Sequence, residues 1–267
     1  MSDTRGASIL FIPHGGGPLP LLDDPGHARL SQFLRDLGQQ LPRPDAILLI
    51  SAHWEADEAR ITGAAHPPLI YDYSGFPEES YQLQYPAPGH PTLACEVQRA
   101  LVGAGLPAHL DSTRGFDHGM FVPLKLMYPE ADIPVVQLSL LSSLDGTAHI
   151  DMGRALAPLR DRRLLVLGSG ATYHNLQAYF SGRMDRDAHL AFEDWLNERC
   201  TDGALSDDQR QTALAHWPLA PGGQHCHPRA EHLLPLQVCA GMATGPARRI
   251  FFDEVMGELS SAFLWQY

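Results

Sequence analysis

Short apolar runs alternate along this chain with longer segments that carry a single apolar face. The runs are typical of buried strands and occupy Ser8–Pro13, Ala46–Ser51, Ile133–Leu140 and Arg163–Gly168, with a shorter candidate at Arg60–Gly63. Helical spacing and helix-boundary residues predict helices at Ala28–Gln40, Pro91–Gly105, Val122–Tyr128, Thr147–Arg160, Asp185–Cys200, Asp207–His216 and Glu231–Met242. One or two closing strands are expected within Arg249–Leu264. This alternation predicts an α/β fold whose largely parallel sheet is covered on both faces.

One long stretch, residues 64–90, shows neither the helical nor the strand spacing of apolar residues, and it is rich in Pro, Gly and Tyr. Long loops of this kind are usually functional or disordered. The aromatic residues here, among them Tyr71, Tyr73 and Phe76, argue against disorder. We therefore expect an ordered loop with a role in the function of the protein.

Composition narrows the possible partners. The chain has 267 residues, 44% of them hydrophobic, and a net charge of −12. Such a charge argues against a nucleic-acid partner and against an anionic membrane surface. No apolar run approaches the roughly 20 residues of a membrane span, and no signal peptide is visible. The four cysteines form no CxxC pair, which favours reduced thiols in a cytoplasmic protein over a disulfide frame or a zinc–thiolate site.

Histidine is abundant, at 14 of 267 residues, and several histidines follow predicted strands. His14 and His53 come directly after the first two strands, and His174 follows the run that ends in Gly-Ser-Gly. A single histidine at a strand end is more often a hydrogen-bonded loop residue than a ligand. Several in one parallel sheet would converge, because the carboxyl ends of parallel strands share one edge. Since imidazole is the commonest transition-metal ligand, the pattern predicts a metal site.

Other motifs in the chain could support different chemistry. The glycines at 15–17 lack the pattern of a phosphate-binding loop. Ser51 or Ser169 could serve a Ser-His-Asp hydrolase, but neither has a diagnostic setting. The stretch His225-Cys226-His227 fits a metal site and a polar loop before a helix about equally well. His118 is expected in a loop, and His232 at the start of a helix.

Seven blocks of sequence together resemble one known family. They are PHGGGP, ISAHWE, YDYSGFP, YPAPG, RGFDHGMFVPL, LGSGATYHNL and HPRAEHLLPL, in order from residue 13 to residue 236. These blocks are similar to the DODA-type extradiol aromatic ring-opening dioxygenases of the LigB-like class III extradiol superfamily. The resemblance implies one LigB-like catalytic domain over residues 1–267, built as an α/β/α sandwich. It also implies one divalent metal, Fe(II) for activity or Zn(II) as bound, and cleavage of a catechol such as DOPA by O2.

The resemblance also implies roles for individual residues. His14, His53 and His232 match metal ligands, and His174 matches an active-site acid/base that can also count as a metal-site residue. His118 matches a second catalytic histidine beside the substrate. Substrate-covering residues are expected at Tyr71, Tyr73 and Phe76. The wider superfamily uses two histidines and a carboxylate, so Glu231 is a possible ligand, but adjacent residues of a helix point about 100° apart. His90 stands where Asp or Asn is expected and is given no function.

Two other functions compete with this interpretation. A zinc-dependent hydrolase on a related sheet would use an activated water with His174 as base, and its activity would not depend on O2. A non-enzymatic LigB-like binding protein is the other alternative, although five retained histidines argue against it. The expected partners are a small catechol and O2, with no nucleic acid and no membrane, in a monomer or small homo-oligomer.

Overall fold

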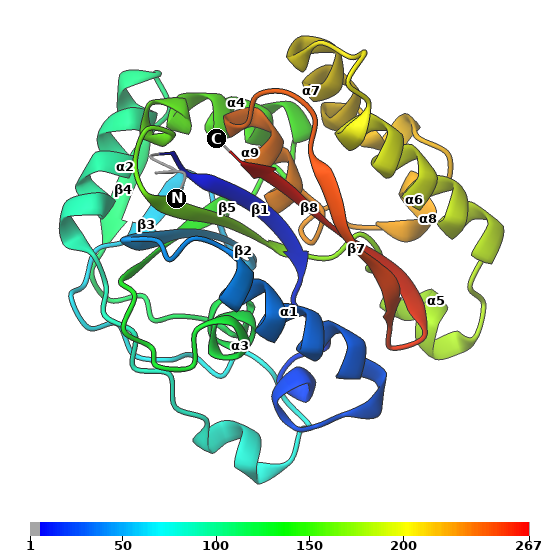
Figure 1. The fold of residues 1–267 in the computed structure, drawn as a ribbon, viewed down its shortest axis with the longest axis horizontal. Coiled ribbons are helices and arrows are strands. Elements are labelled where there is room, and N and C mark those ends of the chain that lie inside the picture. Colours follow the sequence, from blue (N-terminus) through cyan, green and yellow to red (C-terminus); the bar gives the residue numbers. More distant parts are fainter. Residues whose placement is uncertain (1–5, 267) are drawn as a thin grey trace.

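The chain, described here by a computed structural model over residues 6–266, builds one eight-stranded sheet. The strand order is β4-β3-β5-β2-β6-β1-β8-β7 (Figure 1). The strands are β1 (Ser8–Pro13), β2 (Ala46–Ala56), β3 (Ala59–Thr62), β4 (Ala108–Asp111), β5 (Val135–Leu141), β6 (Leu164–Gly170), β7 (Arg248–Val255) and β8 (Glu258–Gln266).

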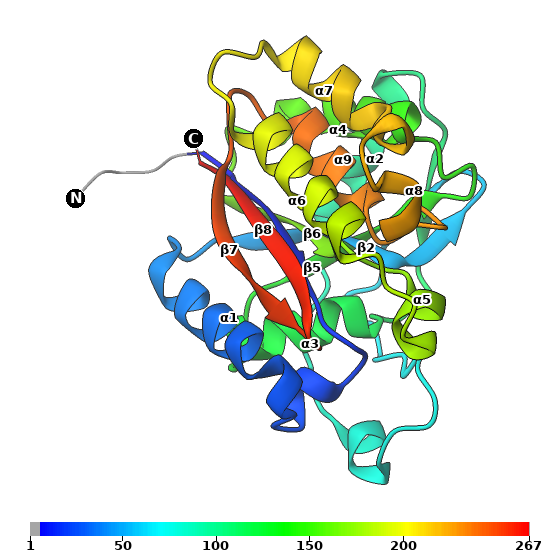
Figure 2. The same ribbon diagram turned by 90° about the vertical axis from the view of Figure 1, so that its right-hand side faces the viewer.

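Helices cover both faces of this sheet, as the two views show (Figures 1 and 2). On one face lie α1 (Ala28–Gln40) and α3 (His118–Met127). The other face carries α2 (Pro91–Gly103), α4 (Gly146–Leu156), α6 (Arg186–Thr201), α7 (Asp207–Ala215), α8 (Gly223–Cys226) and α9 (Leu234–Met242). The short helix α5 (Leu176–Ser181) follows β6. The predicted α/β fold with flanking helices is thus confirmed.

Alternate residues of the central strands enter two separate hydrophobic cores. In β1, Ile9 and Phe11 belong to the core that includes residues of α2, α4, α6 and α9, whereas Leu10 and Ile12 belong to the core that includes residues of α1 and α3. Burial on both faces explains why the central strands are continuous apolar runs without polar alternation.

The sheet is mixed. Its centre, β5-β2-β6-β1, is parallel, because β2 pairs in parallel with both β5 and β6, and β6 with β1. The strand β8 joins β1 antiparallel and forms a hairpin with β7 at one edge. At the other edge, β3 pairs parallel with β4 and antiparallel with β5. The parallel centre is the part that positions the histidines.

Three element boundaries differ from the expectation and move predicted site residues. The strand β2 continues to Ala56 through an irregularity between Ile50 and Glu55, so His53 lies within the strand. The helix α3 begins at His118, which is therefore helical. The helix α9 begins only at Leu234, with Pro235 in its first turn, so His232 precedes the helix. The short elements β4, α5 and α8 were missed.

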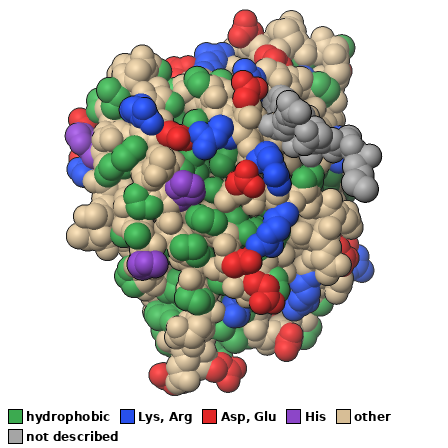
Figure 3. Space-filling model, turned by 60° about the vertical axis from the view of Figure 1, so that its left-hand side comes forward, with side chains coloured by type: hydrophobic (Ala, Val, Ile, Leu, Met, Phe, Trp, Pro, Cys, Tyr) green, Lys and Arg blue, Asp and Glu red, His purple; other side chains and the backbone are tan. Residues whose placement is uncertain are grey.

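Two surface properties bear on the expected partners. On the face in Figure 3, Lys and Arg side chains lie interspersed with Asp and Glu, without a continuous basic patch. None of the described helices has both the length and the apolar character that a membrane crossing requires.

The contact between α4 and α9 generates a stability prediction. A Cβ on Gly153 of α4 would lie 2.1 Å from the carbonyl oxygen of Val238 and 2.8 Å from the Cα of Gly241, both on α9. We expect Gly153→Ala to lower the free energy of unfolding by about 1–3 kcal/mol, because the helices must separate. Urea titration of both proteins measures the change. In the control, Gly103→Ala, the new Cβ meets nothing within 4 Å; equal loss in both variants would contradict the prediction.

Candidate metal centre

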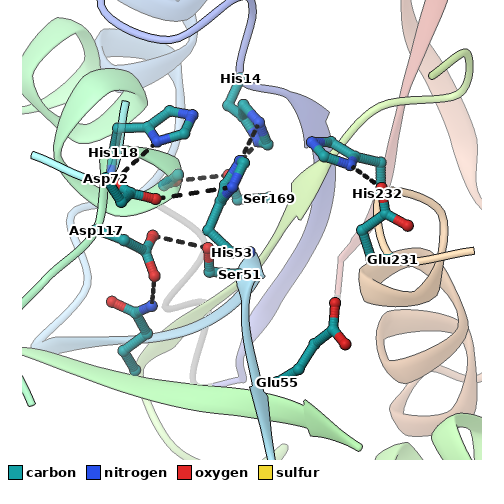
Figure 4. A network of polar contacts seen from close by, with 12 residues as sticks. His14, Ser51, His53, Glu55, Asp72, Asp117, His118, Ser169, Glu231 and His232 are labelled. Carbon is teal, nitrogen blue, oxygen red and sulfur yellow. Dashed lines mark hydrogen bonds and ion pairs between the residues drawn. The ribbon is translucent and has the colours of Figure 1, made fainter. Parts of the chain in front are cut away.

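Five histidines, each from a different part of the chain, gather at the carboxyl-end edge of β1, β2 and β6. His14 comes directly after β1, His53 lies in the far part of β2, and His118 opens α3. His174 follows β6, and His232 lies just before α9. Figure 4 shows His14, His53, His118 and His232 around a common space. All five predicted histidines are therefore brought together.

Three of these rings form a nearly regular triangle. The ring centroids of His14 and His53 are 4.9 Å apart, those of His53 and His232 5.0 Å, and those of His14 and His232 5.3 Å. Imidazoles bound to a single ion through bonds of about 2.1 Å would have centroids about 5 Å apart at tetrahedral angles. The Nε2 atoms of His14 and His53 lie 3.0 Å apart. The donor type and spacing of this triangle fit one divalent metal ion.

His174 lies beside this triangle, stacked on His232. The two ring centroids are 3.3 Å apart and the ring planes are inclined by only 18°. The Nδ1 atoms of both rings face the same carboxylate oxygen, Oε1 of Glu231, at 3.1 Å for His174 and 2.9 Å for His232. Nearly parallel stacked rings aim their remaining nitrogens side by side, which is a poor arrangement for binding one ion. The geometry thus separates His174 from the triangle.

His118 flanks the triangle on its other side. Its ring centroid is 3.9 Å from that of His53. Its Nδ1 lies 3.0 Å from Oδ1 of Asp72, and its backbone N–H donates to the same oxygen at 2.9 Å. Burial alone would raise the pKa of Asp72, but these contacts with His118 lower it overall. An ionised Asp72 therefore fixes His118.

Two alternative groups of ligand atoms also exist among the described residues. The ligand atoms of His14, His53 and His118 lie within 4.8 Å of one another, and so do those of His174, Glu231 and His232. Both groups share members with the triangle. They mark the same centre from its two sides.

Hydrogen bonds determine which nitrogens face the centre. The Ser169 hydroxyl donates to the carbonyl of Gly119 at 2.5 Å, so it accepts from Nδ1–H of His14 at 3.0 Å. This leaves Nε2 of His14 with a free lone pair. Glu231 has the same effect on His232, because a carboxylate accepts from Nδ1–H. Outer partners of this kind orient the imidazole ligands of metal sites.

The electrostatics keep the triangle neutral. Burial, followed by the nearby imidazoles, holds the pKa values of His14 and His53 well below the usual range. Burial also lowers the pKa of His232 to about 4, although Glu231 opposes the shift. Neutral imidazole is the form that binds metals, so these rings are ready ligands at neutral pH.

Glu231 is the carboxylate on which two of the rings depend. Burial would raise its pKa, but hydrogen bonds with His174 and His232 lower the pKa strongly. The Arg229 guanidinium lies 3.2 Å from Oε2 of Glu231. It also donates two hydrogen bonds to Glu55, at 2.6 and 2.7 Å. These charged groups line a polar cavity of about 370 Å³ that reaches His53 and His232.

A second buried carboxylate, Asp117, ties β2 to α3. It accepts from Ser51 at 2.7 Å, from Arg114 at 3.2 Å and from Gln137. Burial raises the pKa of Asp117. The Ser51 hydroxyl also accepts from the backbone N–H of His53 at 3.1 Å. Because Ser51 donates its proton to Asp117, it acts here as a structural group that positions His53.

A larger cavity of about 490 Å³ also adjoins the histidines. It is lined by Tyr73 and Phe76 of the predicted aromatic loop, and by all five histidines. Tyr71 is not in this lining; its hydroxyl donates to the carbonyl of Leu83 at 2.6 Å, and its ring packs 6.0 Å from that of Phe121. Two of the three predicted substrate-covering residues thus reach the cavity.

Sequence reasoning missed the orienting carboxylates. Asp72 lies between the two aromatic residues Tyr71 and Tyr73, where nothing but its position near them hinted at a role. Glu231 was noticed, but only as a competing ligand. In the stretch at 225–227, His225 accepts from the backbone of Asp185 at 3.1 Å and His227 faces the carbonyl of Thr172 at 2.9 Å. Among the described residues, this stretch contributes to no group of three potential metal ligands.

Known proteins resemble the chain over most of its length. The family model "Catalytic LigB subunit of aromatic ring-opening dioxygenase" matches residues 9–263. "Dioxygenase tasH" of Hapsidospora irregularis is 41% identical, and the match covers 97% of this chain and 85% of the relative's chain. "4,5-DOPA dioxygenase extradiol" of Beta vulgaris is 42% identical, and the match covers 87% of this chain and 85% of the relative's chain. The crystal structure of an uncharacterized Escherichia coli K12 protein superposes with a TM-score of 0.78 and 32% identity, covering 96% of this chain and 98% of the other.

The role of Glu231 can be tested through zinc affinity. We expect Glu231→Gln to weaken zinc binding about 10- to 100-fold, because an amide accepts less strongly from the two imidazoles. Competition against a chromophoric chelator measures the affinity. The exposed Glu198 offers the control Glu198→Gln, which should bind zinc as the parent does. Unchanged affinity in Glu231→Gln would show that the carboxylate does not support the centre.

The buried imidazoles also predict how stability depends on pH. In the metal-free protein, His14, His53 and His232 have folded-state pKa values below the unfolded value of about 6.5. Below pH 6.5 the unfolded chain therefore binds protons that the folded protein excludes, and the free energy of unfolding must fall as pH falls. Urea midpoints at pH 7, 6 and 5 measure this slope. His232→Gln should flatten it, whereas His66→Gln at an exposed site should not; a midpoint that rises on acidification would contradict the prediction.

Proposed function

This chain belongs to the LigB family of catalytic subunits of aromatic ring-opening dioxygenases and is an extradiol catechol dioxygenase, and we propose that it holds one divalent metal on His14, His53 and His232. DOPA is the reference substrate, because curated relatives are named for it. The observation that carries the metal assignment is the triangle of three neutral imidazoles, two buried and one partly buried, in the lining of a substrate-sized cavity.

The donor set suits Fe(II) for activity and Zn(II) as an inactive occupant. Both ions accept imidazole nitrogen, but zinc has no redox chemistry. Bound here, Fe(II) would hold catechol and O2 together, lower the pKa values of the catechol hydroxyls and mediate electron transfer between the two. Three neutral ligands leave the full positive charge of the ion to attract a catecholate.

His174 is placed to move a proton at a catechol hydroxyl. Its Nδ1 faces Glu231 at 3.1 Å, so its Nε2 is free to accept a proton. The ionised Glu231 stabilises the imidazolium that this transfer creates. His174 can later return the proton to the opened product. A base held beside the ligand triangle serves this purpose better than a fourth ligand would.

His118 and the aromatic loop are assigned to the substrate. Asp72 fixes the His118 imidazole at the cavity wall. The Tyr73 ring lies 5.7 Å from that of His118 and 5.5 Å from that of Phe76. These rings can orient the catechol and exclude water from the reacting bond.

Ring cleavage gives the first functional prediction. The protein loaded anaerobically with Fe(II) should consume O2 and form a yellow ring-opened product when DOPA is added in air. His14→Ala and His53→Ala should abolish the product, because each removes one of the three proposed metal ligands. The matched control is His66→Ala, at an exposed histidine away from the centre. O2 uptake and absorbance measure the outcome.

Two results would reject this function. Full iron loading without consumption of any catechol would contradict the dioxygenase assignment. O2-independent hydrolysis by the zinc form would favour a hydrolase on the same fold, and failure to take up any metal would favour a binding protein.

Metal content separates the roles of His174 and His232. We expect His174→Gln to keep its metal while turnover falls about 10²- to 10⁴-fold, as for loss of a general base. His232→Gln should lose metal as well as turnover. Metal analysis after dialysis, together with the turnover number, measures both effects. If His174→Gln loses metal as readily as His232→Gln, His174 is a ligand.

A further inference from the structure

The cavity in front of the histidines has apolar walls over most of its extent. Beyond the histidines and the aromatic loop, its lining comes from α5, from the hairpin between β7 and β8, and from the segments that follow β1 and β6. The apolar side chains from α5 and the hairpin are Leu176, Tyr179, Phe180, Val255, Met256 and Leu259. A molecule that binds its catechol ring at the metal centre would extend any ring substituent along these walls.

No Lys or Arg side chain is among the described residues that line this cavity. The one carboxylate in the lining is Glu258, which lies 3.3 Å from Nδ1 of His189. A substrate carboxylate would therefore lose water without gaining a cationic partner, and it would meet a wall of the same sign. Burying an unpaired charge in this way is strongly unfavourable.

The arginines near the histidines are already committed to other partners. Arg229 binds Glu55 through two bonds and also contacts Glu231, on the side of the polar cavity. Arg114 donates to Asp117 and to the backbone carbonyl of His53. Neither arginine lines the large cavity. Neither is available to a carboxylate there.

The apolar wall continues outward to the solvent at α5. Phe180 is 75% exposed and Leu176 49% exposed, and both belong to the cavity lining. Single exposed apolar residues are ordinary. Two on one short helix at the mouth of an apolar cavity extend the surface that an apolar substituent could bury.

We propose that this enzyme selects catechols whose ring substituent is uncharged and apolar, and discriminates against catechols that carry a carboxylate. The proposal rests on the proposed function, because it assumes that the catechol ring binds at the histidines. DOPA carries an ammonium group as well as a carboxylate, so an acid and its ester isolate the effect of the carboxylate.

A matched set of ligands tests this selectivity. The set is 3-(3,4-dihydroxyphenyl)propionate, its methyl ester, 4-butylcatechol and unsubstituted catechol. Calorimetric binding to the zinc-loaded, redox-inert protein gives affinities without turnover, and the iron form gives kcat/KM. We expect the ester and 4-butylcatechol to exceed the carboxylate about tenfold or more in both measurements.

Variants at the mouth locate the effect. Phe180→Ala should weaken binding of 4-butylcatechol several-fold more than that of catechol, through lost apolar contact with the butyl chain. Leu219→Ala, at an 83% exposed site outside the cavity, is the control and should change neither. Leu176→Lys adds a cation at an exposed position and should raise affinity for the carboxylate relative to its ester.

The outcomes distinguish this proposal from the proposed function. If the carboxylate binds the parent protein as tightly as its ester, or tighter, the selectivity proposal is overturned even when ring cleavage is intact. If the iron form cleaves no catechol, the proposed function fails, whereas the order of affinities in the zinc form still decides the selectivity.

Discussion

Parallel pairing of β6 with its two neighbours is the constraint on which the site depends. The register sets Pro13 of β1 opposite Gly170 of β6, and Ser51 of β2 opposite Ser169. His14, just after β1, and His53, within β2, therefore lie at one level along the sheet. A Cβ at Gly170 would lie 2.0 Å from the carbonyl oxygen of His232, so the absent side chain lets that segment pack on the end of β6. The third ring of the triangle, that of His232, is positioned by this backbone contact.

Burial and hydrogen bonding then set the chemistry of the rings. Nδ1 of His14 is hydrogen-bonded to a hydroxyl and Nδ1 of His232 to a carboxylate, and carboxylate oxygens lie within 3.1 Å of Nδ1 of His118 and His174. Burial keeps the triangle neutral. The Nε2 atoms of His14 and His53 face one another at 3.0 Å, a separation that one shared proton or one bound cation can satisfy. The same residues that shape the pocket thus form a set of donors that could bind one metal ion.

Much of this arrangement could be predicted from the sequence. Buried strands are recognisable by apolar runs, parallel order by their alternation with helices, and convergence of histidines by their positions after strands. Seven short motifs sufficed for the family, which the comparisons confirm. These patterns are visible in the local sequence because each strand and helix must bury its own apolar side chains.

Other features depended on contacts that no local pattern contains. Pro235 delays the start of α9, so Glu231 and His232 are not consecutive helical residues, and the argument that they must point apart was wrong. Glu231 instead accepts from His232 at 2.9 Å. Tyr71 could not be separated from Tyr73 by sequence, because only the packed loop shows which ring faces the cavity.

Two cavities of opposite character meet at the histidines, and each suits a different task. The apolar one can hold an aromatic substrate away from water, and the polar one keeps Arg229 and its carboxylate partners beside the ligands. Isotope labelling tests the central claim of ring cleavage by O2 at this centre most directly. A single turnover of the Fe(II) protein with a catechol under ¹⁸O₂, with rapid reduction of the aldehyde to prevent exchange, should place both labelled atoms in the ring-opened product. A product whose new oxygen comes only from water would contradict it.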